Sequence, residues 1–198
     1  ALVLALVMSM SLVTISNAAF KDADSIDYKE AVDVMNAVGV FVGDEKGNFN
    51  AKENLTREQA AKIIAYLELG SKAADALVGS GTFADVAASR WSAGFVGYCA
   101  QAGVVSGNGD GTFAPAGQLT ALQFGKMLLV ELGYDAKAAG MVGADWAINT
   151  SKLMAKAKRM DKIDGSVNQV LTREKAAQMT LNALKAPTVE YTTKGSSI

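Results

Sequence analysis

The chain has 198 residues, of which 50% are hydrophobic and 20% are charged, and its formal net charge is −1. It contains no histidine and a single cysteine, Cys99. Without an imidazole, Ser-His-Asp triads and Cys-His dyads are excluded, as are the common zinc sites. A net charge near zero argues against a nucleic-acid-binding surface, which concentrates basic residues on one face. Carboxylate catalysis, lysine catalysis and binding without chemistry stay open.

The first residues predict a secretory signal. The chain carries no charge before Lys21, and its apolar stretch up to Val13 has the length of a signal-peptide core. Ser16-Asn17-Ala18 then supplies a small-x-small cleavage site. A buried helix and a membrane anchor are the alternatives, but an anchor needs about 20 apolar residues. We therefore expect residues 1–18 to be a signal peptide that is truncated at its start, and the mature protein to be secreted.

A repeat organises the rest of the chain. Phe20-Lys21-Asp22-Ala23 recurs as Phe83-Ala84-Asp85-Val86, and Leu55-Thr56 recurs as Leu119-Thr120. A third, fainter copy contains Leu171-Thr172 but lacks the Phe-x-Asp opening. The matching segments of the first two copies are 63 or 64 residues apart, and self-similarity at a nearly constant spacing indicates a repeat protein. The predicted units are residues 19–70, 82–135 and 141–186, with the third degenerate, and 187–198 is a linker or the start of a C-terminal region.

Each copy predicts a helix, a glycine-rich turn and a second helix. The second helix is expected to begin after a threonine N-cap, at Thr56, Thr120 and Thr172. Gln59 and Gln123 complete a capping box, whereas Lys175 in the third copy does not. No segment alternates long enough to require a substantial sheet, so we predict an all-α fold. Because one short helix pair cannot bury its own apolar stripe, the copies should pack together. The stripes of the second helices are Ala60, Ile63, Ile64 and Leu67; Phe124, Met127, Leu128 and Leu132; and Ala176, Met179, Leu181 and Leu184.

The segment Leu-Thr-Arg-Glu occurs at 55–58 and again at 171–174. Threonine and glutamate suit a helix start, but an arginine at the first helical position faces the positive end of the helix dipole. Its recurrence therefore suggests that Arg57 and Arg173 hold an anion, together with free backbone N–H groups. An ordinary surface arginine is the alternative. The second copy has Ala121 at this position, so any such site is absent or altered there.

Other conspicuous residues favour structural roles. The segment 108–113 resembles part of a calcium loop but lacks ligands at the first and last positions. A turn whose Phe49 or Phe113 fills the core is therefore preferred to a metal site. We likewise expect Trp91 and Trp146 to lie in the core rather than to form ligand platforms. Cys99, on an apolar helix face, is expected to be an inert core residue.

Taken together, these motifs resemble the S-layer homology (SLH) domain. The resemblance rests on Phe83-Ala-Asp-Val, Trp91, Gly103, Gly107 and Asp110-Gly-Thr-Phe-Ala-Pro115, and it covers nearly all of residues 19–186 as three tandem copies. It implies a pseudo-threefold all-α bundle of three helix-loop-helix repeats, with one helix of each repeat in the centre. It also implies anchoring of a secreted protein to the bacterial envelope through secondary cell-wall polysaccharide, often through ketal-linked pyruvate.

The same resemblance implies binding grooves between repeats, with the arginine of the Thr-Arg-x-Glu motif as a principal contact. Because Ala121 replaces that arginine and the third copy lacks Phe-x-Asp, we expect two of the three grooves to be competent. The expected partner is secondary cell-wall polysaccharide or a peptidoglycan-linked glycan, with self-association in a surface layer also open. The candidate ligand-binding residues are Arg57, Arg173, Thr56, Thr172, Asp22, Asp85, Gly43 and Gly107.

The sequence thus predicts a non-catalytic anchoring module at the bacterial cell surface, without cofactor or metal. One alternative is a self-assembling surface-layer protein whose sugar sites are vestigial. Another is a carboxylate-based wall hydrolase, which needs two acids facing each other across a cleft. The acidic residues are scattered without a marked pair, so the hydrolase is disfavoured.

Overall fold

The computed structural model describes residues 20–189. Within that range it contains helices and three isolated β-bridges but no strand, which confirms the all-α prediction. The predicted signal peptide and most of residues 187–198 lie outside the described residues. The elements are η2 (Ala23–Ser25), α2 (Lys29–Ala37), α3 (Arg57–Leu69), α4 (Ser71–Ala74), α5 (Ala93–Gln101), α6 (Ala121–Glu131), α7 (Trp146–Lys156) and α8 (Arg173–Leu184).

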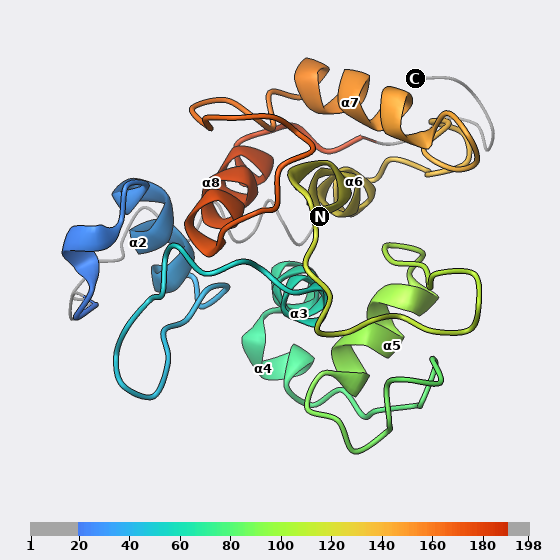
Figure 1. Cartoon of the computed structure of the whole chain (residues 1–198), viewed down its shortest axis with the longest axis horizontal. Coiled ribbons are helices and arrows are strands. Elements are labelled where there is room, and N and C mark those ends of the chain that lie inside the picture. The colour runs from blue at the N-terminus through green and yellow to red at the C-terminus, as the bar shows by residue number, and fades with distance from the viewer. Residues whose placement is uncertain (1–19, 190–198) are drawn as a thin grey trace.

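Three helices form the centre, and each carries one other helix on its outside. Figure 1 shows α3, α6 and α8 in the middle of the molecule, with α2, α5 and α7 around them. The contacts pair α5 with α3, α7 with α6, and α2 with α8. The first helix of a copy therefore packs on the second helix of the preceding copy, and the first copy closes on the third. The copies do pack together, as the short amphipathic helices require.

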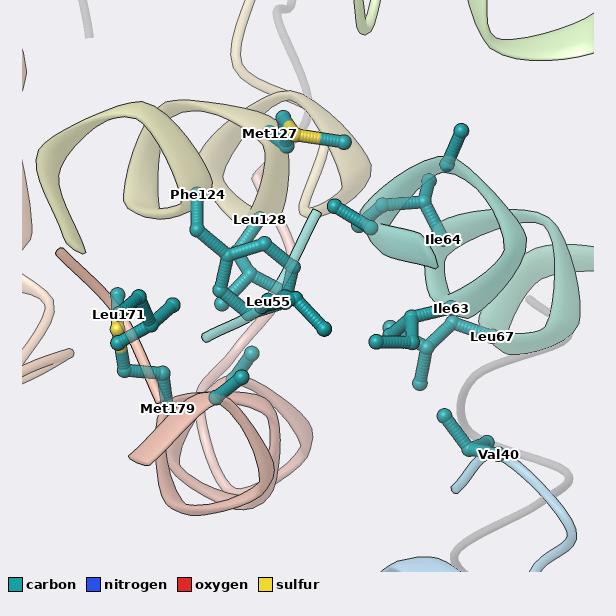
Figure 2. Close-up of a cluster of buried hydrophobic side chains, with 14 of the residues drawn as sticks. Val40, Leu55, Ile63, Ile64, Leu67, Phe124, Met127, Leu128, Leu171 and Met179 are labelled. Carbon is teal, nitrogen blue, oxygen red and sulfur yellow. The ribbon is translucent and has the colours of Figure 1, made fainter. Parts of the chain in front are cut away.

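A ring of three backbone hydrogen bonds joins the segments that precede the central helices. Leu55 N donates to Leu171 O at 2.8 Å, Leu171 N to Leu119 O at 3.0 Å, and Leu119 N to Leu55 O at 3.4 Å. All three side chains are buried. Figure 2 shows Leu55 lying between Phe124 and Leu128 on one side and Met179 on the other. The three copies thus share one core at the entrance to their central helices.

The core contains the residues that the apolar spacing predicts. Phe49 and Phe113 are buried, which confirms that the turns of the first two copies close on an aromatic side chain. Ile64, Phe124 and Met179 are buried on the inner faces of α3, α6 and α8. Cys99 is also buried, as predicted, and burial raises the pKa of its thiol to about 12, so the group is not reactive at neutral pH.

The helix caps separate the third copy from the first two. Gln59 N donates to Thr56 Oγ1 and Gln123 N donates to Thr120 Oγ1, so both predicted capping boxes form. Thr172 makes no side-chain cap, in agreement with the missing glutamine. The loop after α3 contains α4, a helix of one turn that the sequence did not predict. In residues 20–189 no helix has both the length and the apolar character needed to cross a bilayer.

Candidate ligand-binding grooves

Two grooves open on the surface at equivalent places in the first and second copies. Groove 1 surrounds the loop 40–44 and has a volume of about 330 Å³, and groove 2 surrounds the loop 104–108 with a volume of about 380 Å³. Volumes of this size suit a small organic group or a few sugar atoms. Groove 1 is lined by residues that include Val40, Gly43, Asp44, Gln59, Lys62, Trp91 and Arg173, and groove 2 by Val104, Gly107, Asn108, Gln123, Lys126, Trp146 and Arg57.

Each groove takes its functional side chains from three different copies. In groove 1 the arginine, Arg173, begins α8, the lysine, Lys62, lies on α3, and Trp91 precedes α5. Groove 2 is built in the same way from Arg57 on α3, Lys126 on α6 and Trp146 at the start of α7. Both grooves therefore exist only because neighbouring copies pack against one another.

Each arginine also forms hydrogen bonds to backbone carbonyls of the copy that follows it. Arg57 donates from Nε to the carbonyl oxygen of Phe113 at 2.7 Å and from Nη2 to that of Ser106 at 3.1 Å. Its guanidinium lies 4.4 Å from the centre of the Phe113 ring. Two backbone carbonyls and one ring thus set the arginine at the floor of groove 2.

Arg173 repeats this geometry on the first copy. Its Nε and Nη2 donate to the carbonyl oxygens of Phe49 and Val42, both at 3.0 Å, and its guanidinium lies 5.0 Å from the Phe49 ring. Burial lowers the pKa of both arginines, but a guanidinium remains charged at neutral pH. Since each has five N–H donors and two are used by carbonyls, donors remain for an anion.

The glutamate after each arginine is buried and has a structural role. Glu58 accepts a bidentate pair of hydrogen bonds from Arg90, at 2.8 and 2.9 Å, and one from Ser92 Oγ at 2.5 Å. Burial alone would raise the pKa of Glu58, but the hydrogen bonds from Arg90 and Ser92 outweigh it and lower the pKa. Glu174 instead accepts from the Asp27 backbone N–H at 2.8 Å and from Lys52 Nζ at 2.5 Å. Both glutamates join one copy to the next.

The predicted aspartates support the grooves without lining them. Asp22 accepts hydrogen bonds from the backbone N–H groups of Phe49 and Asn50, both at 2.7 Å. Asp85 accepts from Phe113 N at 2.8 Å and from Ala114 N at 2.7 Å, and these backbone bonds lower its pKa. Because both carboxylate oxygens are occupied, these residues hold the loop whose carbonyl binds the arginine.

Gly43 and Gly107 line the two grooves at equivalent positions. A Cβ at Gly43 would lie 2.7 Å from Phe20 Cε1, and one at Gly107 would lie 2.7 Å from Phe83 Cε1. Glycine is therefore required for the loop to pass over the aromatic ring. Thr56 caps α3 and Thr172 lies at the third position described below, so neither threonine lines groove 1 or groove 2.

The tryptophan prediction is wrong for Trp91. Its side chain is 54% exposed and lines groove 1, whereas Trp146 is half-buried, packs against the core and also lines groove 2. Helical spacing did not place these residues because each stands at or just before the start of its helix. Lys62 and Lys126, which also line the grooves, were not among the predicted ligand-binding residues. Their equivalent positions three residues after Gln59 and Gln123 were the available signal.

The third equivalent position is built differently. Ala121 removes the arginine, although its backbone N–H still donates to Gln169 O at 3.1 Å, as that of Arg57 does to Gly117 O at 2.8 Å. The backbone of Asp164 links Tyr28 to Lys175 at this position. Its N–H donates to Tyr28 Oη at 3.3 Å, and its carbonyl oxygen accepts from Lys175 Nζ at 3.0 Å. The cavity here also contacts Thr172. An arginine-based groove of the same form is therefore not present among the described residues.

Comparison with known proteins finds a family match over the loops of both grooves. The sequence model of the S-layer homology domain matches residues 19–61 and 82–123, which contain the loops of grooves 1 and 2. Two segments of the chain match the S-layer homology domain. The matched SLH segments end shortly after the first residues of α3 and α6, where the arginine or its alanine replacement stands. The third copy is not matched.

Several relatives are bacterial surface proteins. The chain is 28% identical over 178 residues to the middle cell wall protein of Brevibacillus brevis, an alignment that covers 87% of this chain and 16% of that protein. It is 27% identical over 175 residues to the surface layer protein of Brevibacillus choshinensis, covering 86% of this chain and 15% of the relative. It is 34% identical over 128 residues to the surface-layer 125 kDa protein of Lysinibacillus sphaericus, covering 63% of this chain and 10% of the relative.

The chain thus spans about a sixth of the length of the first two relatives. Alignments over 86 and 87% of the chain necessarily include a large part of residues 124–198, beyond the two matched SLH segments. The SLH matches and the surface-protein relatives confirm the predicted location, a secreted protein at the bacterial cell surface.

Proposed function

We propose that this chain is a non-catalytic module that anchors a surface protein to the bacterial cell wall by binding an acidic glycan in grooves 1 and 2. The observation that carries the proposal is the repeated convergence of an arginine, a lysine and a tryptophan from three copies. The acidic group that the SLH resemblance suggests is ketal-linked pyruvate on secondary cell-wall polysaccharide. In this proposal residues 141–186 form a third, degenerate SLH repeat.

The chemistry of each groove suits a carboxylate-bearing sugar. The arginine and the lysine supply two positive charges, and a guanidinium can bind a carboxylate through two parallel N–H donors. The apolar face of an indole suits the C–H face of a sugar ring, and its N–H remains able to donate. Burial lowers the pKa of Lys126, so that lysine gains from an anionic partner. Asp44 and Glu53 also line groove 1, whereas the described lining of groove 2 contains no carboxylate, so groove 2 should be the more selective of the two for acidic sugars.

A cell-wall pull-down with groove variants tests the proposal. Arg57 and Arg173 support loops as well as grooves, so they are poor first choices. Lys62→Gln with Lys126→Gln removes one charge from each groove without removing any hydrogen bond shown for residues 20–189. Glutamine is the residue that the third copy has at this position, Gln178. We expect wall binding to fall at least tenfold.

The matched control is Lys72→Gln with Lys137→Gln, which removes the same charge from exposed positions outside both grooves. It should bind walls as the parent does. Chemical removal of pyruvate from the walls should reduce binding of the parent to the level of the double groove variant. Equal binding of the groove and control variants would contradict the proposal. Binding that appears only after the protein has assembled into a lattice would favour the self-assembling alternative.

A further inference from the structure

The end of the first helix of the third copy carries two basic residues that replace a glycine and a valine. In the first two copies this helix ends at Gly39-Val40 and at Gly103-Val104. Gly39 N donates to Asn36 O and Val40 N to Met35 O, and the same pattern joins Gly103 and Val104 to α5. In the third copy Lys158 N donates to Ala155 O and Arg159 N to Met154 O. Lys158-Arg159 therefore stands in the place of Gly-Val.

Arg159 is buried as deeply as the valines it replaces. It is 1% exposed, compared with 5% for both Val40 and Val104. Its Nη1 donates to the carbonyl oxygen of Asn182 on α8, and its Nε has no hydrogen-bond partner. Among residues 20–189 no carboxylate forms an ion pair with it. Among residues 20–189, the bond to the Asn182 carbonyl is thus the one hydrogen bond shown for this buried guanidinium.

Such an arrangement is unfavourable unless something supplies the missing negative charge. A buried charge costs free energy when it is removed from water, and a partly satisfied one retains most of that cost. Burial accordingly lowers the pKa of Arg159. A valine at this position would avoid the cost, as it does in the other two copies. An anion in contact with the guanidinium would offset that cost.

A cavity suited to an anion lies beside Arg159. It has a volume of about 640 Å³, larger than either groove, and is lined by the end of α7, the following turn, α8 and residues up to Val189. Its lining also includes Lys156, Lys158, Lys162 and Lys185, and we call this site the basic cavity. Two of these lysines hold left-handed backbone, with φ of 53° at Lys158 and 63° at Lys162, a conformation that lysine rarely adopts.

The negative charges nearby do not neutralise this cluster. Asp161 is the acidic residue in the lining, and Glu30 on α2 lies 3.2 Å from Lys185 Nζ and 4.0 Å from Lys162 Nζ. All three partners in the Glu30 contacts are more than half exposed, so these ion pairs contribute little. Five basic side chains thus face two carboxylates, whereas groove 2 presents one arginine and one lysine, and groove 1 presents the same two cations beside Asp44 and Glu53.

We propose that the basic cavity binds a phosphate group carried by a wall glycan, as a second attachment point separate from grooves 1 and 2. The excess of cations suits a dianionic or repeatedly charged ligand better than a single carboxylate. The guanidinium of Arg159 supplies donors at the base and the lysines supply charge at the rim. The volume admits a polyol or sugar attached to the phosphate.

Titration calorimetry with sn-glycerol 3-phosphate as the probe tests the proposal on the full chain. The variant is Lys158→Asn with Lys162→Asn, because asparagine is among the non-glycine residues that adopt left-handed backbone most readily and removes both charges. We expect the parent to bind and this variant to bind at least tenfold more weakly. The control, Lys72→Asn with Lys137→Asn, should stay within twofold of the parent. No binding by the parent, or equal loss in both variants, would overturn the proposal.

Arg159→Gln provides a second readout. Glutamine can still donate to the Asn182 carbonyl but carries no charge. Because a ligand that binds the folded state raises its melting temperature, glycerol phosphate should raise the Tm of the parent and leave that of Arg159→Gln unchanged. An equal rise in both would overturn the role of the arginine. If Arg159→Gln does not fold, the two-lysine variant decides the outcome alone.

Further experiments identify the source of the phosphate and distinguish binding at the basic cavity from binding at grooves 1 and 2. Poly(glycerol phosphate) should compete with glycerol phosphate, and a neutral dextran should not. Binding to vesicles of phosphatidylglycerol, lost in the two-lysine variant and unmatched by the soluble polymer, would overturn the assignment to a glycan. Lys62→Gln with Lys126→Gln should bind glycerol phosphate as the parent does. The two proposals can therefore fail independently.

Discussion

The first two copies and the third copy show how one repeat can keep its packing while its surface changes. Grooves 1 and 2 share an arginine bound to two carbonyls and a lysine and a tryptophan in the lining, although groove 1 also contains Asp44 and Glu53. At the third position Ala121 and Tyr28 stand where the arginine and tryptophan would be, and a lysine-rich cavity lies further along α8. Each copy nevertheless contributes one leucine to the single hydrogen-bonded ring in the centre.

The difference teaches that two kinds of constraint act on each copy. The ring leucines face equivalent neighbours and are leucine in all three copies. The junction arginine is replaced by Ala121 in the second copy while the leucine ring still forms, so this position can change without loss of the fold. The following predictions use equivalent positions to break or sharpen this comparison, beginning with the largest effect.

The largest effect is expected in the turns. Phe113 is buried under Arg57 in the second copy, whereas backbone hydrogen bonds align it with Gly165 in the third. Phe113→Ala should lower the free energy of unfolding by about 3–5 kcal/mol, because it leaves a cavity in the shared core. Chemical denaturation measures this. A loss below about 1 kcal/mol would mean that the turn is not part of the cooperative core.

The next effect depends on pH and concerns the far ends of the central helices. Burial and the neighbouring carboxylate of Glu68 raise the pKa of Glu131 to about 8, and the two carboxyl groups hydrogen-bond to each other. The folded state therefore retains a proton that the unfolded chain releases near its ordinary pKa of 4.5. The free energy of unfolding should be greatest below pH 4.5 and should fall as the pH rises through about 8.

Glu131→Gln should remove most of this slope and make the protein more stable than the parent at pH 9, by up to a few kcal/mol. Thermal unfolding between pH 5 and pH 9 measures the difference. The third central helix is followed by Lys185 and offers no such pair, so Lys185→Gln is the control and should leave the slope unchanged. A parent whose stability rises over this range would contradict the assignment.

Loss of a junction arginine should have a smaller effect. Arg57→Met keeps much of the packing against Phe113 but removes two hydrogen bonds to carbonyls, so the free energy of unfolding should fall by about 2 kcal/mol. The same change at Arg173 should cost a similar amount. Urea denaturation of both variants would test the equivalence of the two grooves, which would fail if only one variant were destabilised.

The smallest effect is expected at the caps. Thr56→Val and Thr120→Val each remove a capping hydrogen bond and should cost about 1 kcal/mol. Thr172→Val should be neutral or stabilising, because Thr172 Oγ1 is buried without a hydrogen-bond partner among residues 20–189. Denaturation midpoints of the three variants provide the comparison. Equal losses at all three positions would show that Thr172 forms a cap in solution.

The sequence was sufficient for the features that depend on local chemistry. Thr56 with Gln59 predicts a capping box, and the spacing of Ile64 and Leu67 predicts a buried face, because both signals act within one helix. Arg57 and Arg173 were identified because an arginine at the first helical position is unfavourable in an isolated helix. Their position at the floor of two grooves follows that signal, although their bonds to the carbonyls of the next copy were not foreseen.

Other features could not be predicted because they depend on which copies meet. The apolar stripe of α2 is compatible with several partners, and nothing local shows that α8 covers it. Trp91 was assigned to the core because aromatic residues usually are, yet it lines a groove formed with α3, α8 and the loop 40–44. Lys158-Arg159 could have been found by aligning the helix ends on Gly39-Val40, but the low similarity of the third copy concealed that correspondence.

The closure of α2 on α8 has a consequence for cooperativity. In an open array of repeats, the end units have a single neighbour and can unravel while the others remain folded. Here the leucine ring and the α2–α8 contact leave no end unit, since every copy has two neighbours. Deleting any copy would expose a helix face on each of the other two. The three copies should therefore fold and unfold as one unit, and a force applied to one copy is shared by all three.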